Sequence, residues 1–173
     1  MGFLCRLFGN CKKEEVKKTG EIKIVSPLDG KVIPLQEVPD PTFAQALLGN
    51  GIGVEPQKSG VVKSPVDGTI IQLFETKHAF VVETEEGVQV LTHFGLNTVK
   101  LKGEGFEIIT KEGSKVKAGD PIVKFDYDFL KANADSIVTP VVILETEEYK
   151  AVNPVEGLTE AVAGETVIIN IEK

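Results

Sequence analysis

The chain has 173 residues, of which 42% are hydrophobic and 26% are charged, as is usual for one globular domain with a buried core. The net charge is −7 at pH 7, and the lysines are scattered, which argues against nucleic acid as a partner. No apolar run approaches the roughly 20 residues that span a bilayer. The two cysteines, Cys5 and Cys11, both lie close to the N-terminus. They form no disulfide framework, so we expect a reducing compartment, the cytoplasm.

Residues 1–19 are predicted to form a flexible N-terminal tail, and residues 20–173 a single folded domain. The tail lacks the charged leader and cleavage site of a signal peptide, and Arg6 stands where a myristoylation motif needs Ser or Thr. Its apolar residues would share one face of a short helix that precedes several lysines. We expect either a weak contact of this tail with a membrane surface or a frayed end.

A turn phrase occurs twice after the tail. Ser26-Pro27-Leu28-Asp29-Gly30 and Ser64-Pro65-Val66-Asp67-Gly68 each lead into an apolar run, because proline presets φ and glycine accepts a positive φ. A looser repeat, residues 116–123 and 161–168, is typical of two strands joined by a glycine turn. Short strands between such turns predict an all-β fold, an antiparallel β-sandwich or barrel-sandwich with two or three short helices.

Two short helices are expected to lie as lids on the β body. The first covers residues 41–48, with Asp40 as its N-cap and Pro41 at the first helical position. The second covers residues 128–134 with Asp128 as its cap. On the first helix Phe43 and Leu47 would form an apolar stripe, and taken alone this spacing favours core packing over a docking face.

Both histidines lie in one predicted hairpin, two apolar runs around the turn Thr84-Glu85-Glu86-Gly87. A midpoint between the two glutamates places Phe80 opposite Leu91 and His78 opposite His93. The two histidine Cβ atoms would then lie about 4.5–5.5 Å apart. A shift of one residue would send one histidine to the other face. Paired imidazoles relay a proton or phosphoryl group, hold a metal, or sense pH.

Several polar groups adjoin the predicted pair. Thr76 lies two residues before His78, so on a strand it points to the same face and can orient the ring through a ring nitrogen. The carbonyl of Gly95 can accept the Nδ1–H of His93, which leaves Nε2 as a nucleophile. Asp40 is a carboxylate that would approach the pair if the first helix covers it.

The sequence lacks the full set of residues that other kinds of catalytic or cofactor site require. A zinc site usually takes three or four protein ligands; zinc bound by His78, His93 and a partner's carboxylate therefore remains an alternative. There is no Gly-x-Ser-x-Gly elbow for hydrolysis and no Gly-Lys-Ser/Thr loop for a nucleotide. The hairpin tip carries no lysine of the kind that lipoyl and biotin carriers use. Without a nucleotide site, phosphoryl transfer would need a phosphorylated protein as donor.

From about Gly20 to its C-terminus the chain resembles the glucose-family IIA component of the bacterial phosphoenolpyruvate-dependent sugar phosphotransferase system. The phrases that carry the resemblance are Phe74-Glu75-Thr76-Lys77-His78-Ala79-Phe80, Thr92-His93-Phe94-Gly95-Leu96-Asn97-Thr98-Val99, Leu101-Lys102-Gly103-Glu104-Gly105-Phe106, Gly119-Asp120 and Thr139-Pro140-Val141-Val142. The resemblance implies an antiparallel β-sandwich and a phosphotransferase component that needs no cofactor.

For the site, the resemblance implies that His93 takes a phosphoryl group from the phosphocarrier protein HPr. His93 then hands the group to a cysteine of the IIB domain of a sugar permease. His78 would hydrogen-bond the phosphoryl oxygens, with Thr76 behind it and the Gly95 carbonyl fixing the tautomer of His93. The alternative function is a regulatory binding module whose phosphorylation state controls partner binding.

The resemblance also implies an apolar ring around the histidines that docks partner proteins. By position its members are Phe43, Leu47, Leu48, Phe74 and Val99. This reverses the preference for core packing, and we expect Phe43 and Leu47 to be partly exposed. The rim departs from the family pattern in three places: Asn97 replaces a common acidic residue, Leu91 an aromatic one, and Pro41-Thr42 an apolar pair.

Overall fold

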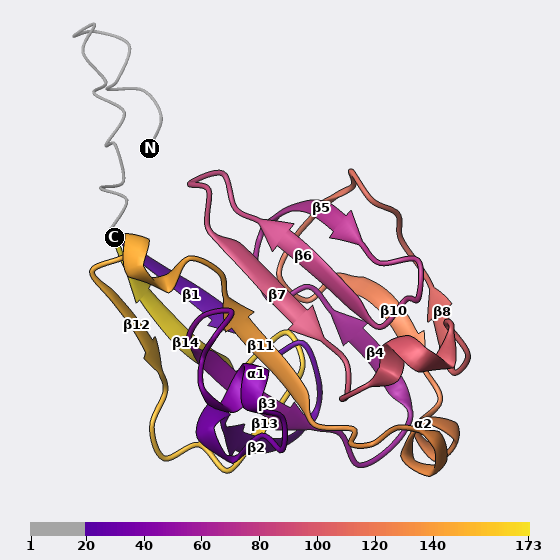
Figure 1. The fold of residues 1–173 in the computed structure, drawn as a ribbon. Coiled ribbons are helices and arrows are strands. Elements are labelled where there is room, and N and C mark those ends of the chain that lie inside the picture. The colour runs from indigo at the N-terminus through magenta and orange to yellow at the C-terminus, as the bar shows by residue number, and fades with distance from the viewer. Residues whose placement is uncertain (1–19) are drawn as a thin grey trace, which may run out of the picture.

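The structure is a computed structural model that describes residues 20–173. The predicted tail, its membrane contact and both cysteines lie outside these residues. Antiparallel strands dominate the fold (Figure 1), which confirms the predicted all-β class. The strands are β1 (Glu21–Val25), β2 (Gly30–Pro34), β3 (Gly51–Glu55), β4 (Gly60–Lys63), β5 (Gly68–Leu73), β6 (Ala79–Glu83), β7 (Gln89–His93), β8 (Phe106–Ile108), β9 (Lys115–Val116), β10 (Pro121–Phe125), β11 (Thr139–Ile143), β12 (Ala151–Pro154), β13 (Glu160–Ala161) and β14 (Val167–Glu172).

The helices are short, as predicted. They are α1 (Pro41–Ala44) and α2 (Tyr127–Asn133), with 3-10 turns η1 (Leu35–Glu37), η2 (Thr98–Leu101) and η3 (Thr146–Glu148). Over residues 20–173 none of them has the length and apolar character needed to cross a bilayer.

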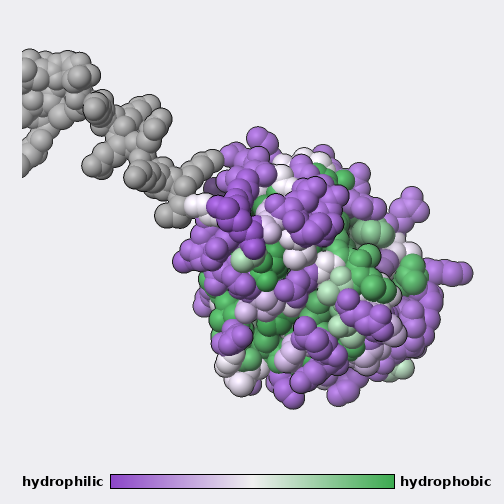
Figure 2. Space-filling model, turned by 60° about the vertical axis from the view of Figure 1, so that its left-hand side comes forward, coloured by the Kyte–Doolittle hydropathy of each residue, from purple (hydrophilic) through white to green (hydrophobic). Residues whose placement is uncertain are grey.

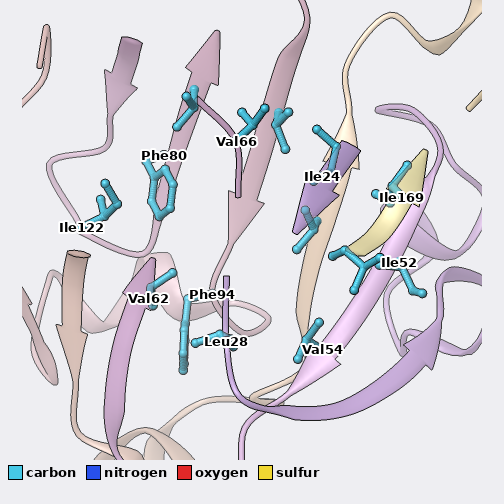
Figure 3. Packing of buried hydrophobic residues seen from close by; sticks show 14 of the residues in the cluster. Ile24, Leu28, Ile52, Val54, Val62, Val66, Phe80, Phe94, Ile122 and Ile169 are labelled. Atoms are coloured by element: carbon cyan, nitrogen blue, oxygen red, sulfur yellow. The ribbon is translucent and has the colours of Figure 1, made fainter. Parts of the chain in front are cut away.

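The strands form three sheets. An eight-stranded sheet has the order β13-β2-β3-β11-β7-β6-β5-β9, and two three-stranded sheets have the orders β1-β14-β12 and β4-β10-β8. Valine and isoleucine fill the inner faces because branched side chains pack well on a pleated surface. All three sheets contribute to one core, to which Ile24, Val54, Phe80, Ile122 and Ile169 belong (Figure 3). Hydrophilic residues dominate the face drawn in Figure 2, with apolar ones between them, as on most proteins.

The two Ser-Pro-x-Asp-Gly phrases make equivalent contacts. The Ser26 hydroxyl donates to the carbonyl of Leu28 and the Ser64 hydroxyl to that of Val66. The turns also join each other, because the Val25 N–H donates to the Pro65 carbonyl and the Lys63 N–H to the Pro27 carbonyl, both at 2.9 Å. The two turns therefore sit back to back, related by an approximate twofold rotation.

The looser repeat completes this pseudosymmetry. The Asp29 carboxylate accepts the N–H of Ala163, and the Asp67 carboxylate accepts the N–H of Ala118, each at 2.7 Å. Strand β2 pairs with β13 and β5 pairs with β9 in the same way. Each Ser-Pro-x-Asp-Gly turn is thus hydrogen-bonded to one of the two glycine turns of the looser repeat. The two repeats seen in the sequence are therefore parts of one structural duplication.

The β6–β7 hairpin differs from the prediction by one residue of register. Ala79 lies opposite His93 and Phe80 opposite Thr92, so the predicted pairings of His78 with His93 and of Phe80 with Leu91 are wrong. The loop has three residues because Gly87 has φ +87°, which closes a longer turn between Thr84 and Val88.

Both helix caps involve aspartate, but only one is the predicted residue. Asp40 accepts the N–H of Thr42 at 2.8 Å, as expected, whereas α1 ends at Ala44 and Ala46 adopts a φ of 53°. For α2 the cap is Asp126 rather than Asp128, because Asp126 has an extended backbone and accepts the N–H of Phe129. The segment with η1 and α1 lies between β2 and β3, whereas the equivalent link from β5 to β6 is a tight turn.

Candidate active site

The two histidines meet despite the shifted register. Their ring centroids lie 4.8 Å apart with an interplanar angle of 82°, edge to face. His78 lies in the turn before β6, not in the strand, so strand alternation does not direct its ring. Lys77 has a φ of 59° in this turn, and the His78 carbonyl accepts the N–H of Phe94 at 2.7 Å. The turn at Lys77 therefore brings the His78 ring beside that of His93, which the strand register alone would not do.

Each ring has one nitrogen engaged by a neighbour two residues away. The Thr76 hydroxyl lies 2.6 Å from Nδ1 of His78. Nδ1 of His93 lies 2.8 Å from the carbonyl oxygen of Gly95, and a carbonyl can only accept, so Nδ1 carries the hydrogen. In neutral His93 the lone pair is therefore on Nε2.

Burial keeps both imidazoles neutral near pH 7. His78 is 5% exposed, and burial, with a smaller contribution from His93, lowers its pKa to about 4. Burial also lowers the pKa of His93, which the Gly95 carbonyl, the backbone of His93 itself and the Asp40 carboxylate partly offset. Asp40 thus approaches the site from the α1 cap, as the sequence suggested.

Two phenylalanines contact the pair. The Phe43 ring lies 5.1 Å from that of His93, and the Phe74 ring 5.6 Å from that of His78. Phe43 is 5% exposed and packs among Leu35, Val38, Leu96, Val138 and Val142. The expectation that Phe43 is partly exposed is therefore wrong, because α1 turns this side chain inward onto a second small core.

The other predicted docking residues lie differently. Leu47, Leu48 and Val99 are 66%, 41% and 53% exposed, whereas Phe74 is half-buried against Ala79, Val81 and Leu91. Of the five predicted docking residues, three are therefore exposed, and the two phenylalanines are the ones that contact the imidazoles.

A polar cluster beside the site was missed in the sequence. Asp135 accepts hydrogen bonds from the side chains of Asn97 and Lys100, just after Gly95 in the chain. Asp135 is 35 residues from Lys100, and no spacing rule joins an aspartate after α2 to the turn after β7. The backbone bridge between Leu96 and Ser136 brings the two segments together.

A resident metal site is not apparent in the part of the chain that the structure describes. There, no three His, Cys, Asp or Glu side chains are grouped so that they could hold an ion. The imidazole pair offers two ligands, so further ligands would have to come from elsewhere.

The fold and the site define an antiparallel β-sandwich protein with a pair of adjacent, neutral imidazoles. Residues 22–149 match the family described as phosphoenolpyruvate-dependent sugar phosphotransferase system, EIIA 1. The chain belongs to this family, and the resemblance seen in the sequence is confirmed. It is a phosphoryl-transfer component of the sugar phosphotransferase system.

Relatives cover nearly the whole chain. The glucose-specific EIIA component of Bacillus anthracis is 45% identical over 154 residues, which are 89% of this chain and 92% of that protein. The glucose-specific EIIA component of Haemophilus influenzae is 40% identical over 173 residues, the full length of both. Among solved structures, glucose permease IIA from Mycoplasma capricolum has a TM-score of 0.76 at 32% identity, covering 87% of this chain and 95% of that chain.

Proposed function

We propose that His93 is the phosphoryl acceptor and donor of this chain. In the proposed sequence Nε2 of His93 receives the group from a phosphohistidine of HPr and passes it to a cysteine of the IIB domain of a sugar permease. The observation that carries the proposal is the 2.8 Å contact between Nδ1 of His93 and the Gly95 carbonyl, because it leaves Nε2 as the nucleophile.

The first transfer exchanges one P–N bond for another. The Nε2 lone pair of His93 attacks phosphorus in line as the bond to the donor's imidazole breaks, and the donor nitrogen leaves with that electron pair. The attacking nitrogen carries no proton, so no base is needed at this step. The Nδ1–H of His93 stays hydrogen-bonded to the Gly95 carbonyl, which stabilises the positive charge that forms on the ring.

His78 is proposed to stabilise the phosphoryl oxygens. When the Thr76 hydroxyl donates to Nδ1 of His78, the hydrogen of that ring is on Nε2, where it can serve as a donor to the oxygens. The edge-to-face arrangement of the rings keeps this donor beside His93. Preorganised donors of this kind stabilise charge in the transition state.

The exposed apolar side chains are proposed as the docking ring for both protein partners. Leu47, Leu48 and Val99 would offer the exposed apolar area, and Phe43 and Phe74 contact the two imidazoles. A phosphoryl group that passes between proteins needs an accessible acceptor, and His93 is only half-buried. With HPr as the donor and a IIB cysteine as the acceptor, we expect the chain in the cytoplasm.

The test is phosphorylation by phosphorylated HPr, followed by addition of a purified IIB domain. We expect wild type to carry label and lose it to IIB, and His93→Ala to carry none. His78→Gln is expected to accept the group and fail to pass it on. Thr98→Ser serves as a matched control beside the site. Label on His93→Ala protein would overturn the assignment.

Regulatory binding is the second candidate function, since the same exposed leucine and valine side chains suit a protein partner. Zinc held by His78, His93 and a carboxylate of that partner would strengthen such a complex. Binding of a candidate target to unphosphorylated and phosphorylated protein, with and without zinc, tests this role. Equal binding in all four conditions would exclude it for that target.

A further inference from the structure

Asp135 joins both ends of the turn that follows the active-site glycine. One carboxylate oxygen accepts the side-chain amide of Asn97, the residue that precedes η2. The other oxygen pairs with the ammonium group of Lys100 within η2. One carboxylate thus spans the turn from end to end.

The backbone next to Asp135 contacts the same turn. The N–H of Leu96 donates to the carbonyl of Ser136 at 2.8 Å. At Gly95 an added Cβ would lie 2.7 Å from this Ser136 oxygen, so the two chain segments are in close contact there. Gly95 is therefore held between the 135–136 segment on one side and the turn that Asp135 spans on the other.

Stability alone gives little reason for this cluster. The side chains of Lys100 and Asp135 are 50% and 49% exposed, and exposed ion pairs contribute little to folding. Asn97 adopts a left-handed backbone with φ 54°, a conformation that asparagine tolerates better than most residues. The Asn97 and Lys100 contacts lower the pKa of Asp135, so both favour the carboxylate form.

We propose that Asp135 is a positioning residue of the phosphoryl-transfer site, which holds the Gly95 carbonyl on Nδ1 of His93 through Asn97 and Lys100. The proposal rests on the proposed function of His93, and it adds a residue outside the resemblance and outside the predicted site. The active-site turn is thereby fixed from a segment 40 residues further along the chain.

The chemical consequence concerns the tautomer of His93. While the Gly95 carbonyl accepts from Nδ1, the Nε2 lone pair is free to attack. If the carbonyl drifts, Nδ1 loses this partner and part of the His93 population carries its hydrogen on Nε2 instead. That fraction cannot attack phosphorus, so the rate of acceptance falls in proportion.

The test compares four proteins by imidazole ¹⁵N NMR and by the rate of phosphorylation from phosphorylated HPr. Asp135→Ala removes the carboxylate. The swap Asn97→Asp with Asp135→Asn keeps an Asn–Asp pair, the net charge and a carboxylate near Lys100. Glu104→Gln is the matched control, because it removes one exposed negative charge from a side chain outside the cluster of Asn97, Lys100 and Asp135.

We expect wild type, the swap and Glu104→Gln to show His93 with its hydrogen on Nδ1. Asp135→Ala is expected to show a mixture of tautomers and a fall of about three- to fivefold in the phosphorylation rate, the range that an exposed pair can shift. Unchanged His93 nitrogen shifts in Asp135→Ala, or failure of the swap to restore them, would overturn the proposal. The NMR comparison needs no phosphoryl transfer. Failure of wild type to be phosphorylated would therefore count against the proposed function and leave the positioning role to be judged by the shifts.

Discussion

The ring of Phe43 rests 5.1 Å from the ring of His93, although Phe43 belongs to the segment between β2 and β3 and His93 ends β7. The pseudosymmetric link between β5 and β6 is a tight turn that holds Thr76 and His78. The duplicated halves thus differ at the histidine pair: one link supplies His78, and the longer one supplies α1, whose Phe43 covers His93.

Phe43→Ala is expected to expose His93 and to destabilise the fold. Loss of a buried phenylalanine costs about 3–5 kcal/mol in unfolding free energy. Because burial is the main cause that lowers the pKa of His93, this pKa should rise toward its ordinary value. An NMR titration of the His93 ring measures the pKa. Phe43→Leu, which keeps most of the apolar cover, should show a smaller rise, and an unchanged pKa in Phe43→Ala would contradict the role of α1.

Stability should fall as the pH drops from about 6.5 to about 4, partly through His78. In the unfolded chain this histidine binds a proton near pH 6.5, whereas in the folded protein its pKa is about 4. The unfolded state therefore holds more protons within this window, and acid favours it. This difference in the pKa of His78 between the folded and unfolded states corresponds to about 3 kcal/mol of unfolding free energy. Denaturant unfolding of wild type and His78→Gln at both pH values measures it, and parallel curves for the two proteins would refute the prediction.

Gly95→Ala should impair both folding and phosphoryl acceptance. Gly95 has φ +66°, and an added Cβ would lie 2.7 Å from the Ser136 carbonyl oxygen and 2.8 Å from a methyl carbon of Thr98. Gly87 offers a matched control, since it has φ +87° but no described atom within 4 Å of an added Cβ. Gly87→Ala thus carries the backbone strain alone, roughly 1 kcal/mol. We expect Gly95→Ala to lower the free energy of unfolding, measured by chemical denaturation, at least twice as much as Gly87→Ala does. Equal losses in the two variants would argue against a close contact at Gly95.

Thr92→Val should stabilise the protein. Thr92 is 1% exposed, and its hydroxyl has no hydrogen-bond partner among the residues that the structure describes. Valine has the same shape without the buried polar group, so a gain of about 1 kcal/mol is expected. Thr98→Val is the opposite case, because the buried Thr98 hydroxyl donates to the Phe94 carbonyl at 2.6 Å. Thermal unfolding should move the two variants in opposite directions, and destabilisation by Thr92→Val would show that its hydroxyl has a partner.

Local patterns in the sequence were enough to predict the class of fold and the neighbours of each imidazole. The repeated turns follow from the fixed φ of proline and the permissive φ of glycine, and both occur in equivalent structural positions. Thr76 and Gly95 each lie two residues from their histidine, and contacts over so short a distance depend mainly on local backbone geometry. Asp40 caps α1 for the same reason.

Patterns of this kind predicted the hairpin but not its register. The predicted two-residue loop would need a positive φ at Glu85, whereas the observed three-residue loop puts the positive φ on Gly87, a signal that the prediction overlooked. The prediction of adjacent imidazoles succeeded for a different reason from the one given, because the turn at Lys77 directs His78 toward His93.

The sequence by itself determined that short strands alternate with glycine turns and that each imidazole has a polar neighbour, because propensities and contacts within a few residues are written into the local chain. Only the tertiary structure decided that Phe43 faces inward onto His93 and that Asp135 spans the turn after Gly95. Those contacts join segments tens of residues apart. Their geometry is set by how three sheets pack around one core, which no local pattern encodes.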